Sequence, residues 1–106
     1  MDIQYKKGVL KLCLLSLLYN NDWYGYDISE ALSKITEISD GTVYPILRKM
    51  KTEGLVNTYL SEKSNGPPRK YYTITTLGKE EFQKQAKEWL DFSEAVKNLI
   101  KENYDG

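Results

Sequence analysis

The side chains of this sequence that are best suited to chemistry are basic, and they are concentrated in its middle third. The chain of 106 residues is balanced overall, with 15 basic and 15 acidic residues. Between residues 42 and 72, however, two acidic side chains accompany six basic ones: Arg48, Lys49, Lys51, Lys63, Arg69 and Lys70. The last 31 residues carry seven acids and five lysines. This distribution predicts a polyanion as partner, bound by one face of the protein.

The remaining side chains exclude most catalytic chemistry. The sequence has no histidine and a single cysteine, Cys13, which removes the usual general base and nearly every transition-metal site. No disulfide can form within the chain, as is usual in a reducing compartment. Cys13 lies in an apolar run and is interpreted as a small packed residue rather than a reactive thiol. We therefore expect no enzyme activity, no metal and no cofactor.

Arg48 and Lys49 belong to a segment, residues 40–54, that is predicted to be a helix. Ser39 or Asp40 can cap its start, and Gly54 can end it. On a wheel of about 100° per residue, one face is apolar and must point to the core: Val43, Ile46, Leu47 and Met50. The opposite face consists of Gly41, Pro45, Arg48 and Thr52, flanked by Tyr44 and Lys49.

The start of this helix contains two residues that disfavour helices. Gly41 and Pro45 are poor in a helix interior, and both lie on the exposed face. In one interpretation the regular helix begins near Gly41 or Thr42 with a distorted first turn, which leaves an approachable N-terminus whose unpaired N–H groups suit a phosphate. In the other, which this stretch alone supports equally, the two residues simply end the preceding turn.

The segments before this helix predict two more helices. Residues 8–19 are apolar nearly all round, and a turn follows at residues 20–23. Residues 25–35 form a second helix with three apolar residues on its buried side: Ile28, Leu32 and Ile35. Two short helices with a tight connection suggest a helix-turn-helix.

The segments after it predict a hairpin and a long helix. Residues 55–61 and 70–74 alternate in polarity and are predicted as strands around a loop stiffened by two prolines. Thr75 or Thr76 can cap a final helix over residues 77–103. The predicted fold is therefore mainly α with a small β-hairpin (α+β).

Two helices predict a second subunit. The helix over residues 8–19 has more apolar surface than so short a chain can cover. The final helix carries a heptad-like stripe in which Ser93 fills a gap: Phe82, Ala86, Trp89, Val96 and Ile100. We expect the helix-turn-helix and the hairpin to form one unit over residues 1–76 and a dimerisation helix to follow over residues 77–106, together forming one compact domain.

The N-terminus resembles a signal peptide because Lys6 and Lys7 precede an apolar run. Lys11 interrupts that run, no small-residue cleavage site follows, and the run is too short to span a bilayer. We expect a cytoplasmic protein without a membrane partner.

Three blocks resemble the PadR family of bacterial transcriptional regulators: "YGYDISEAL" at 24–32, "GTVYPILRKMKTEGLV" at 41–56 and "GPPRKYYTITTLG" at 66–78. The resemblance covers essentially the whole chain and is strongest to the short subgroup with a single C-terminal helix. It implies a winged helix-turn-helix repressor, a homodimer through its N- and C-terminal helices, often released from DNA by a phenolic or planar aromatic compound. The stretches "TYLSEKSN" and "TTLG" depart from the family pattern and leave operator and ligand open.

The resemblance also implies roles for single residues. Thr42 and Tyr44 match positions that contact the DNA backbone. Arg48, central on the exposed face, is expected to enter the major groove and read guanine, and Lys49 to meet phosphate.

The wing is expected to add contacts to phosphate or to the minor groove through Lys63, Arg69 and Lys70; a solvated hairpin tip is the alternative. A two-fold dimer predicts a pseudo-palindromic operator in double-stranded DNA.

Trp89 and Ser93 are candidates for binding an effector. Trp89 lies in the middle of the stripe. Two roles are equally supported for it: packing in the core, or lining a cavity that two subunits share. Ser93 leaves space one turn later, so a planar aromatic or phenolic ligand could lie between two copies of Trp89 at the dimer axis.

Two alternatives stay open. A winged helix can also serve as a protein-interaction module without DNA binding, and salt-dependent binding to duplex DNA discriminates between the two functions. Three tyrosines could be core or functional residues: Tyr26, Tyr71 and Tyr72. Side chains alternate along a strand, so Tyr71 and Tyr72 point to opposite faces and at most one of these two is buried.

Overall fold

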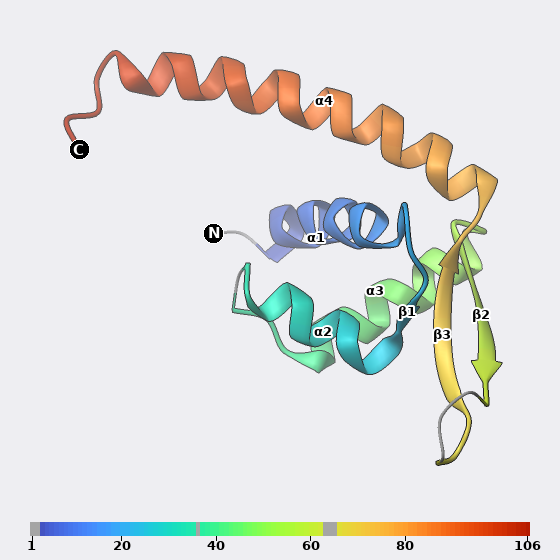
Figure 1. Cartoon of the computed structure of the whole chain (residues 1–106). Helices are drawn as coiled ribbons and strands as arrows, with labels where there is room; N and C mark the ends of the chain where they lie inside the picture. The colour runs from blue at the N-terminus through green and yellow to red at the C-terminus, as the bar shows by residue number, and fades with distance from the viewer. Residues whose placement is uncertain (1–2, 36, 63–65) are drawn as a thin grey trace.

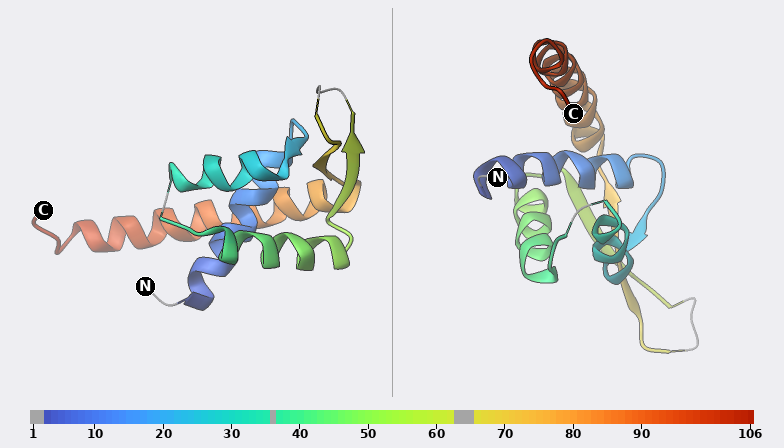
Figure 2. Two further views of the ribbon diagram at one scale, coloured as in Figure 1. Left: turned by 90° about the horizontal axis from the view of Figure 1, so that it is seen from below. Right: turned by 90° about the vertical axis from the view of Figure 1, so that its left-hand side faces the viewer.

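An apolar helix runs through the centre of the molecule, and the computed structural model, which describes residues 3–35, 37–62 and 66–106, packs the other elements around it (Figure 1). This helix, α1 (Ile3–Leu18), begins five residues earlier than predicted. Helix α4 (Thr76–Lys101) lies on one side of α1, and α2 (Gly25–Ser33) and α3 (Asp40–Thr52) lie on the other (Figure 2). Four leucines of α1 are buried between them: Leu10, Leu14, Leu15 and Leu18.

Helices α2 and α3 form the predicted helix-turn-helix. Ile28 and Leu32 of α2 are fully buried, as expected. The expectation for Ile35 is wrong, because this side chain is 68% exposed. Helix α2 ends at Ser33, so Ile35 lies beyond the last helical residue and its side chain leaves the apolar face.

The first turn of α3 is tightened. The N–H groups of Thr42 and Val43 both donate to the carbonyl oxygen of Ser39, at 3.0 and 3.2 Å. Ser39 occupies the N-cap position, and within the described chain its side chain makes no capping bond. Pro45 lies inside α3 as its sixth residue, where its missing N–H deprives the carbonyl of Gly41 of a helical partner. The helix therefore begins at Asp40, before the predicted start near Gly41 or Thr42, and Pro45 lies within it.

The end of α3 is a Schellman motif. Gly54 has a positive φ of 79°, its N–H donates to Lys51 at 3.0 Å, and the N–H of Leu55 donates to Met50 at 2.9 Å. Glycine adopts this backbone conformation without strain. Leu55 and Met50 are both buried, so the motif also fixes where the chain enters the sheet.

The sheet contains the predicted hairpin and one strand that the sequence did not reveal. Strands β2 (Val56–Ser61) and β3 (Arg69–Ile74) pair antiparallel, and β1 (Trp23–Tyr24) pairs with the other edge of β3. The sequence predicts only a turn over residues 20–23. Two residues are too few to show alternation, and β1 is defined by its partner β3, which is distant in sequence. Tyr72 is buried and Tyr71 half-buried, so at most one is buried, as predicted.

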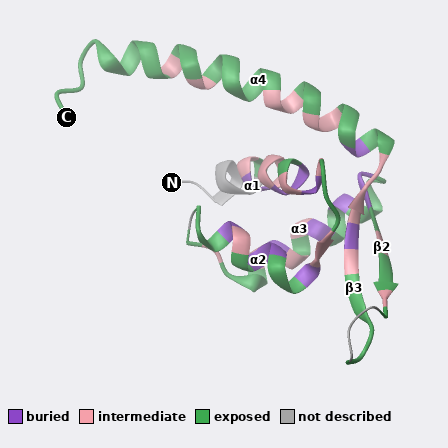
Figure 3. Cartoon of the chain, in the orientation of Figure 1, coloured by how far each residue is buried: buried purple, intermediate pink, exposed green. Residues whose placement is uncertain are grey.

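Helix α4 begins on a side-chain cap and then leaves the core. Thr75 Oγ1 accepts a hydrogen bond from the N–H of Gly78 at 3.0 Å, as predicted for one of the two threonines. Phe82 packs against Tyr19, with ring centroids 4.9 Å apart. The second half of α4 is mostly exposed (Figure 3) and gives the chain a length of 56 Å against widths of 27 and 21 Å. In the described ranges, no helix is both long and apolar enough to cross a membrane.

Candidate nucleic-acid interface

Helix α3 presents a polar face to solvent. Val43, Leu47 and Met50 are fully buried, and Ile46 packs against the core. The opposite face is exposed, as the wheel predicts: Gly41, Pro45, Arg48, Lys49 and Thr52. A Cβ added to Gly41 would meet only Ser39 Oγ, at 3.6 Å. The packing of the described residues therefore leaves room for a side chain at this position.

A hollow of about 330 Å³ lies beside this face, between the start of α2, α3 and β3. We call it the tyrosine hollow; it is lined by Tyr24, Gly25, Tyr26, Tyr44, Arg48, Lys70 and Tyr72. Gly25 is buried there, and a Cβ added to it would lie 3.1 Å from the ring of Tyr72. The hollow therefore brings together three of the predicted site residues: Tyr44, Arg48 and Lys70.

The tyrosine hollow combines two cations with neutral hydroxyl groups. Lys70 Nζ lies 5.5 Å from the centroid of the Tyr72 ring, within the range of a cation–π interaction. Burial raises the pKa of the Tyr72 phenol, against the opposing effect of the Arg48 guanidinium. Burial also raises the pKa of the Tyr44 phenol. Both phenols are therefore protonated at neutral pH and can donate hydrogen bonds, as Arg48 and Lys70 can, so the hollow suits an anion.

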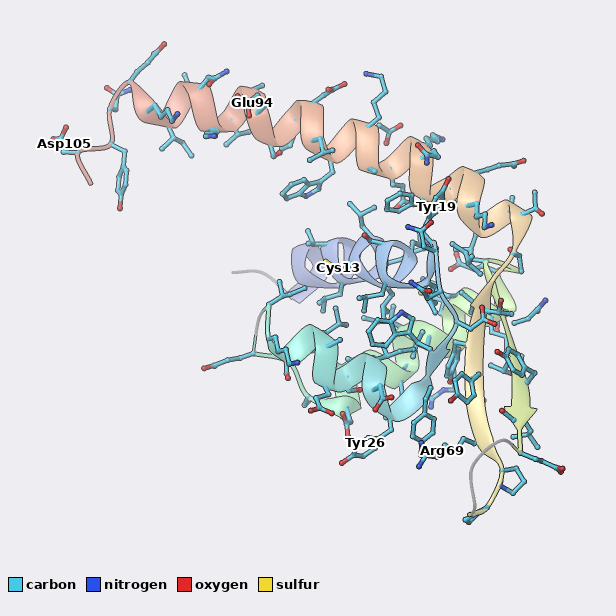
Figure 4. The ribbon with its side chains drawn as sticks, viewed as in Figure 1. Cys13, Tyr19, Tyr26, Arg69, Glu94 and Asp105 are labelled. Carbon is cyan, nitrogen blue, oxygen red and sulfur yellow. The ribbon has the colours of Figure 1, made fainter. Side chains whose placement is uncertain are left out.

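The wing supplies a further cation next to its loop. Arg69 is the first residue of β3 and is exposed. Its guanidinium lies over the ring of Tyr24, with Cζ 4.9 Å from the ring centroid. Figure 4 shows Arg69 and Tyr26 on the side of the molecule that faces away from α4. Lys63 lies outside the described residues.

The other predicted residues are distributed as follows. Lys49 is exposed on α3, and Thr42 is half-buried in its first turn. Lys51 donates to Thr58 Oγ1 at 2.8 Å, an interaction that ties α3 to β2. No group of three or more His, Cys, Asp or Glu side chains that could hold a metal ion occurs in the part of the chain that the structure describes.

Trp89 and Ser93 lie on α4, across α1 from the tyrosine hollow. Both line a second hollow of about 420 Å³ along α4, together with Phe92, Val96, Lys97, Ile100, Lys101 and Tyr104. Trp89 also lines a groove of about 360 Å³ between α4 and the Gly8–Leu12 side of α1. Trp89 is 38% exposed, so packing within one chain does not cover its ring.

Sequence reasoning missed Tyr24 and did not connect Tyr26 and Tyr72 to a site. The signal was nonetheless present, because Gly25 stands between two tyrosines at the start of a helix. A glycine at a helix start indicates that another group approaches the backbone closely. Here that group is the Tyr72 ring, from a strand far along the chain.

Comparison with known proteins agrees with this geometry. The sequence model of the Transcriptional regulator PadR-like family matches residues 14–84. A PadR-like transcriptional regulator from Bacillus cereus is 39% identical, with a TM-score of 0.83 over 92% of this chain and 96% of that one. A PadR-like transcription factor from Bacteroides fragilis is 32% identical, with a TM-score of 0.76 over 91% and 94% of the two chains.

A curated relative, the negative transcriptional regulator PadR of Bacillus subtilis, is 28% identical over 100 residues, which are 91% of this chain and 53% of that protein. The chain thus spans about half the length of that relative. These relatives are transcriptional regulators and not enzymes, in agreement with the prediction. The chain therefore belongs to the PadR-like family of transcriptional regulators.

Proposed function

We propose that the protein is a dimeric repressor that binds a pseudo-palindromic operator in double-stranded DNA. The observation that carries this proposal is the arrangement of the exposed cations. Arg48 and Lys49 on α3 and Arg69 and Lys70 on β3 are all exposed, and Arg48 and Lys70 line the same tyrosine hollow. Repression is supported by the Bacillus subtilis relative, which is a negative regulator of transcription. A regulator of transcription acts on the chromosome, so we also infer that the protein works in the cytoplasm.

The cations divide into two roles. Arg48 is central on the exposed face of α3 and has the planar donor fork that suits guanine in the major groove. Arg69 is at the loop end of the wing, where contact with phosphate or the minor groove carries little sequence information. Thr42, Tyr44, Lys49, Lys63 and Lys70 are assigned to the DNA backbone. The two arginines should therefore respond differently to the sequence of the duplex.

The test measures dissociation constants for an operator duplex and a random duplex over a salt series. Arg69→Ala should weaken binding to both duplexes and reduce the salt slope by about one phosphate per subunit. Arg48→Ala removes a bidentate pair with guanine in each subunit, so it should reduce the preference for the operator by about 1–3 kcal/mol per pair. Lys87→Ala is the matched control, since Lys87 is exposed on α4 and paired with Asp91. If both arginine variants lost the same affinity on both duplexes, the roles assigned to Arg48 and Arg69 would be refuted. If the wild type showed no salt-dependent binding to either duplex, a protein-interaction module would be favoured.

The surface of α4 supports a homodimer. Five large apolar residues of its second half are 38–66% exposed: Trp89, Leu90, Phe92, Leu99 and Ile100. The radius of gyration of 16.0 Å exceeds the value of about 13 Å for a compact chain of this length. Monomeric proteins rarely expose large apolar patches, and Trp89, Phe92 and Ile100 line one hollow. A second copy, packed with its α4 against this surface, would cover it.

Truncation tests the dimer. Removing residues 86–106 should uncover the side of α1 that shares a groove with Trp89 and give aggregated or unfolded protein, measured by analytical ultracentrifugation and circular dichroism. Leu90→Lys serves as a milder variant that should weaken the dimer while keeping the fold. A soluble, folded monomer from the truncation would contradict the proposal.

We further propose that a planar aromatic or phenolic compound binds between the two copies of Trp89. The hollow that Trp89 and Ser93 line is apolar and open on the face expected to meet the second subunit. Binding can release DNA only if the ligand prefers a different spacing of the two recognition helices. Titration of planar cationic dyes and phenolic acids should quench tryptophan fluorescence in the wild type and leave Trp89→Ala unchanged. Quenching that survives in Trp89→Ala would point to Trp23, the other tryptophan of the chain, and end the proposal.

A further inference from the structure

The Arg69 guanidinium has an aromatic platform beneath it. Its Cζ lies 4.9 Å from the centroid of the Tyr24 ring. Among the described residues no carboxylate forms an ion pair with Arg69. Arg69 therefore rests on an aromatic face while its charge is not neutralised by a partner within those residues.

The platform itself is held in place by a row of rings. Tyr24 and Tyr59 are both paired with Tyr71, one from each neighbouring strand, so the three side chains lie on the same face of the sheet. Ring centroids are 5.9 Å apart for Tyr24 and Tyr71 and 5.7 Å apart for Tyr71 and Tyr59. We call these three residues the tyrosine row. At its far end, the Tyr59 hydroxyl donates to Asp22 at 2.7 Å.

Stacking on Tyr24 leaves the arginine able to bind an anion. A cation–π contact uses the face of the guanidinium, whereas its five N–H donors point outward in the plane. A long exposed side chain normally loses rotamer freedom when it docks, and a side chain that is already restricted loses less. The stack thus prepares Arg69 for a phosphate without occupying its donors.

We propose that Tyr24 is a positioning residue for Arg69: its ring, fixed by the tyrosine row, orients the guanidinium toward the DNA backbone. The inference rests on the proposed DNA binding and deepens it. It also requires arginine at position 69, because lysine keeps the charge but lacks the planar group that stacks on a ring.

The first experiment needs no DNA. The chain has two arginines, Arg48 and Arg69, so an NMR spectrum of arginine side chains contains two Nε–H signals, and Arg69→Lys assigns them. The side-chain protons of Arg69 should show an upfield ring-current shift and restricted motion. Both effects should persist in Tyr24→Phe and vanish in Tyr24→Leu. Tyr26→Leu is the matched control, because Tyr26 stacks on Tyr24 at 6.2 Å and no cation–π contact joins it to Arg69.

The second experiment is a double-mutant cycle on duplex binding. Tyr24→Leu should weaken binding about two- to fivefold per subunit, the equivalent of about 0.5–1 kcal/mol for an exposed cation–π interaction at RT of about 0.59 kcal/mol. Arg69→Lys, an exposed substitution that should not affect folding, should weaken binding about as much while it keeps the salt slope. Tyr24→Leu should then cost nothing further in the Arg69→Lys protein.

The outcomes separate this inference from the proposed function. If the wild type binds duplex and the affinity losses of Tyr24→Leu and Arg69→Lys add in the double variant, the positioning role of Tyr24 is overturned. The proposed DNA binding is then unaffected. An unshifted Arg69 signal in the wild type would overturn it as well. If the wild type binds no duplex, the proposed function fails and this inference fails with it, whatever the NMR spectrum shows.

Discussion

Gly78 is the position where one methyl group should disturb the structure most. A Cβ added there would lie 2.2 Å from the carbonyl oxygen of Leu55 and 2.7 Å from Ile74 Cγ1. The nearer atom belongs to the backbone, so no side-chain rotation relieves the clash. The start of α4 would have to move by roughly 1 Å to restore an ordinary C···O separation.

Such a movement has a second cost, because Thr75 joins the same elements. Its hydroxyl donates to the carbonyl oxygen of Gly54 at 2.6 Å and accepts from the N–H of Gly78 at 3.0 Å. Overpacking costs about 1–3 kcal/mol and removal of an N-cap about 1 kcal/mol, while alanine regains up to about 1 kcal/mol of helix propensity. Gly78→Ala should therefore lower the free energy of unfolding by about 1–3 kcal/mol.

Urea and thermal unfolding, followed by circular dichroism at one subunit concentration, measure this effect. Each kcal/mol should lower Tm by roughly 4–8 °C in a domain of this size. Gly8→Ala is the matched control, since Gly8 lies exposed in α1 and an added Cβ meets nothing within 4 Å; it should be stabilising by about 0.5–1 kcal/mol. If Gly78→Ala were as stable as the wild type, the close approach of α4 to Leu55 would be wrong.

Two further experiments test the cap of α4 and the packing of Cys13. Thr75→Val should destabilise the protein by about 0.5–2 kcal/mol in urea unfolding because it removes the cap of α4. Thr75→Ser keeps the hydroxyl and should be close to the wild type in stability. Equal destabilisation by both substitutions would exclude a role for the hydroxyl. Burial raises the pKa of the Cys13 thiol, which lowers its thiolate fraction at neutral pH. Cys13 should therefore react with iodoacetamide several-fold more slowly than free cysteine and recover the full rate in urea; a fast reaction in the native protein would show that Cys13 is not packed as described.

The sequence predicts α3 well because its information is local. The apolar residues of α3 recur with the helical period, and Gly54 ends the helix by its own backbone preference. The cap at Thr75 is equally local, since the donor that it accepts from is three residues away. Each of these features is confirmed because no distant part of the chain competes with it.

The features that the sequence did not predict depend on contacts between distant segments. Strand β1 exists because Trp23 and Tyr24 pair with Tyr72 and Tyr71. The sequence pattern places Ile35 on the core side because the apolar period continues past Ser33, where the helix has already ended. The tyrosine hollow needs α2, α3 and β3 together, so its membership could not be derived from spacing along any one of them.

The proposed effector site on α4 and the proposed DNA surface lie on opposite sides of α1, so an influence of one on the other requires an element that touches both. Helix α4 is such an element, because its second half lines the hollow with Trp89 and its first turn packs against the end of α3. The Schellman motif fixes Gly54 and Leu55 to the end of α3, the Thr75 hydroxyl binds the carbonyl of Gly54, and Gly78 packs directly on Leu55. Because backbone meets backbone here, we expect a rotation of α4 to shift the end of α3. A ligand that changes the spacing of two α4 helices would in this way change the spacing of the two α3 helices, and its differential affinity for the two spacings sets how much DNA is released.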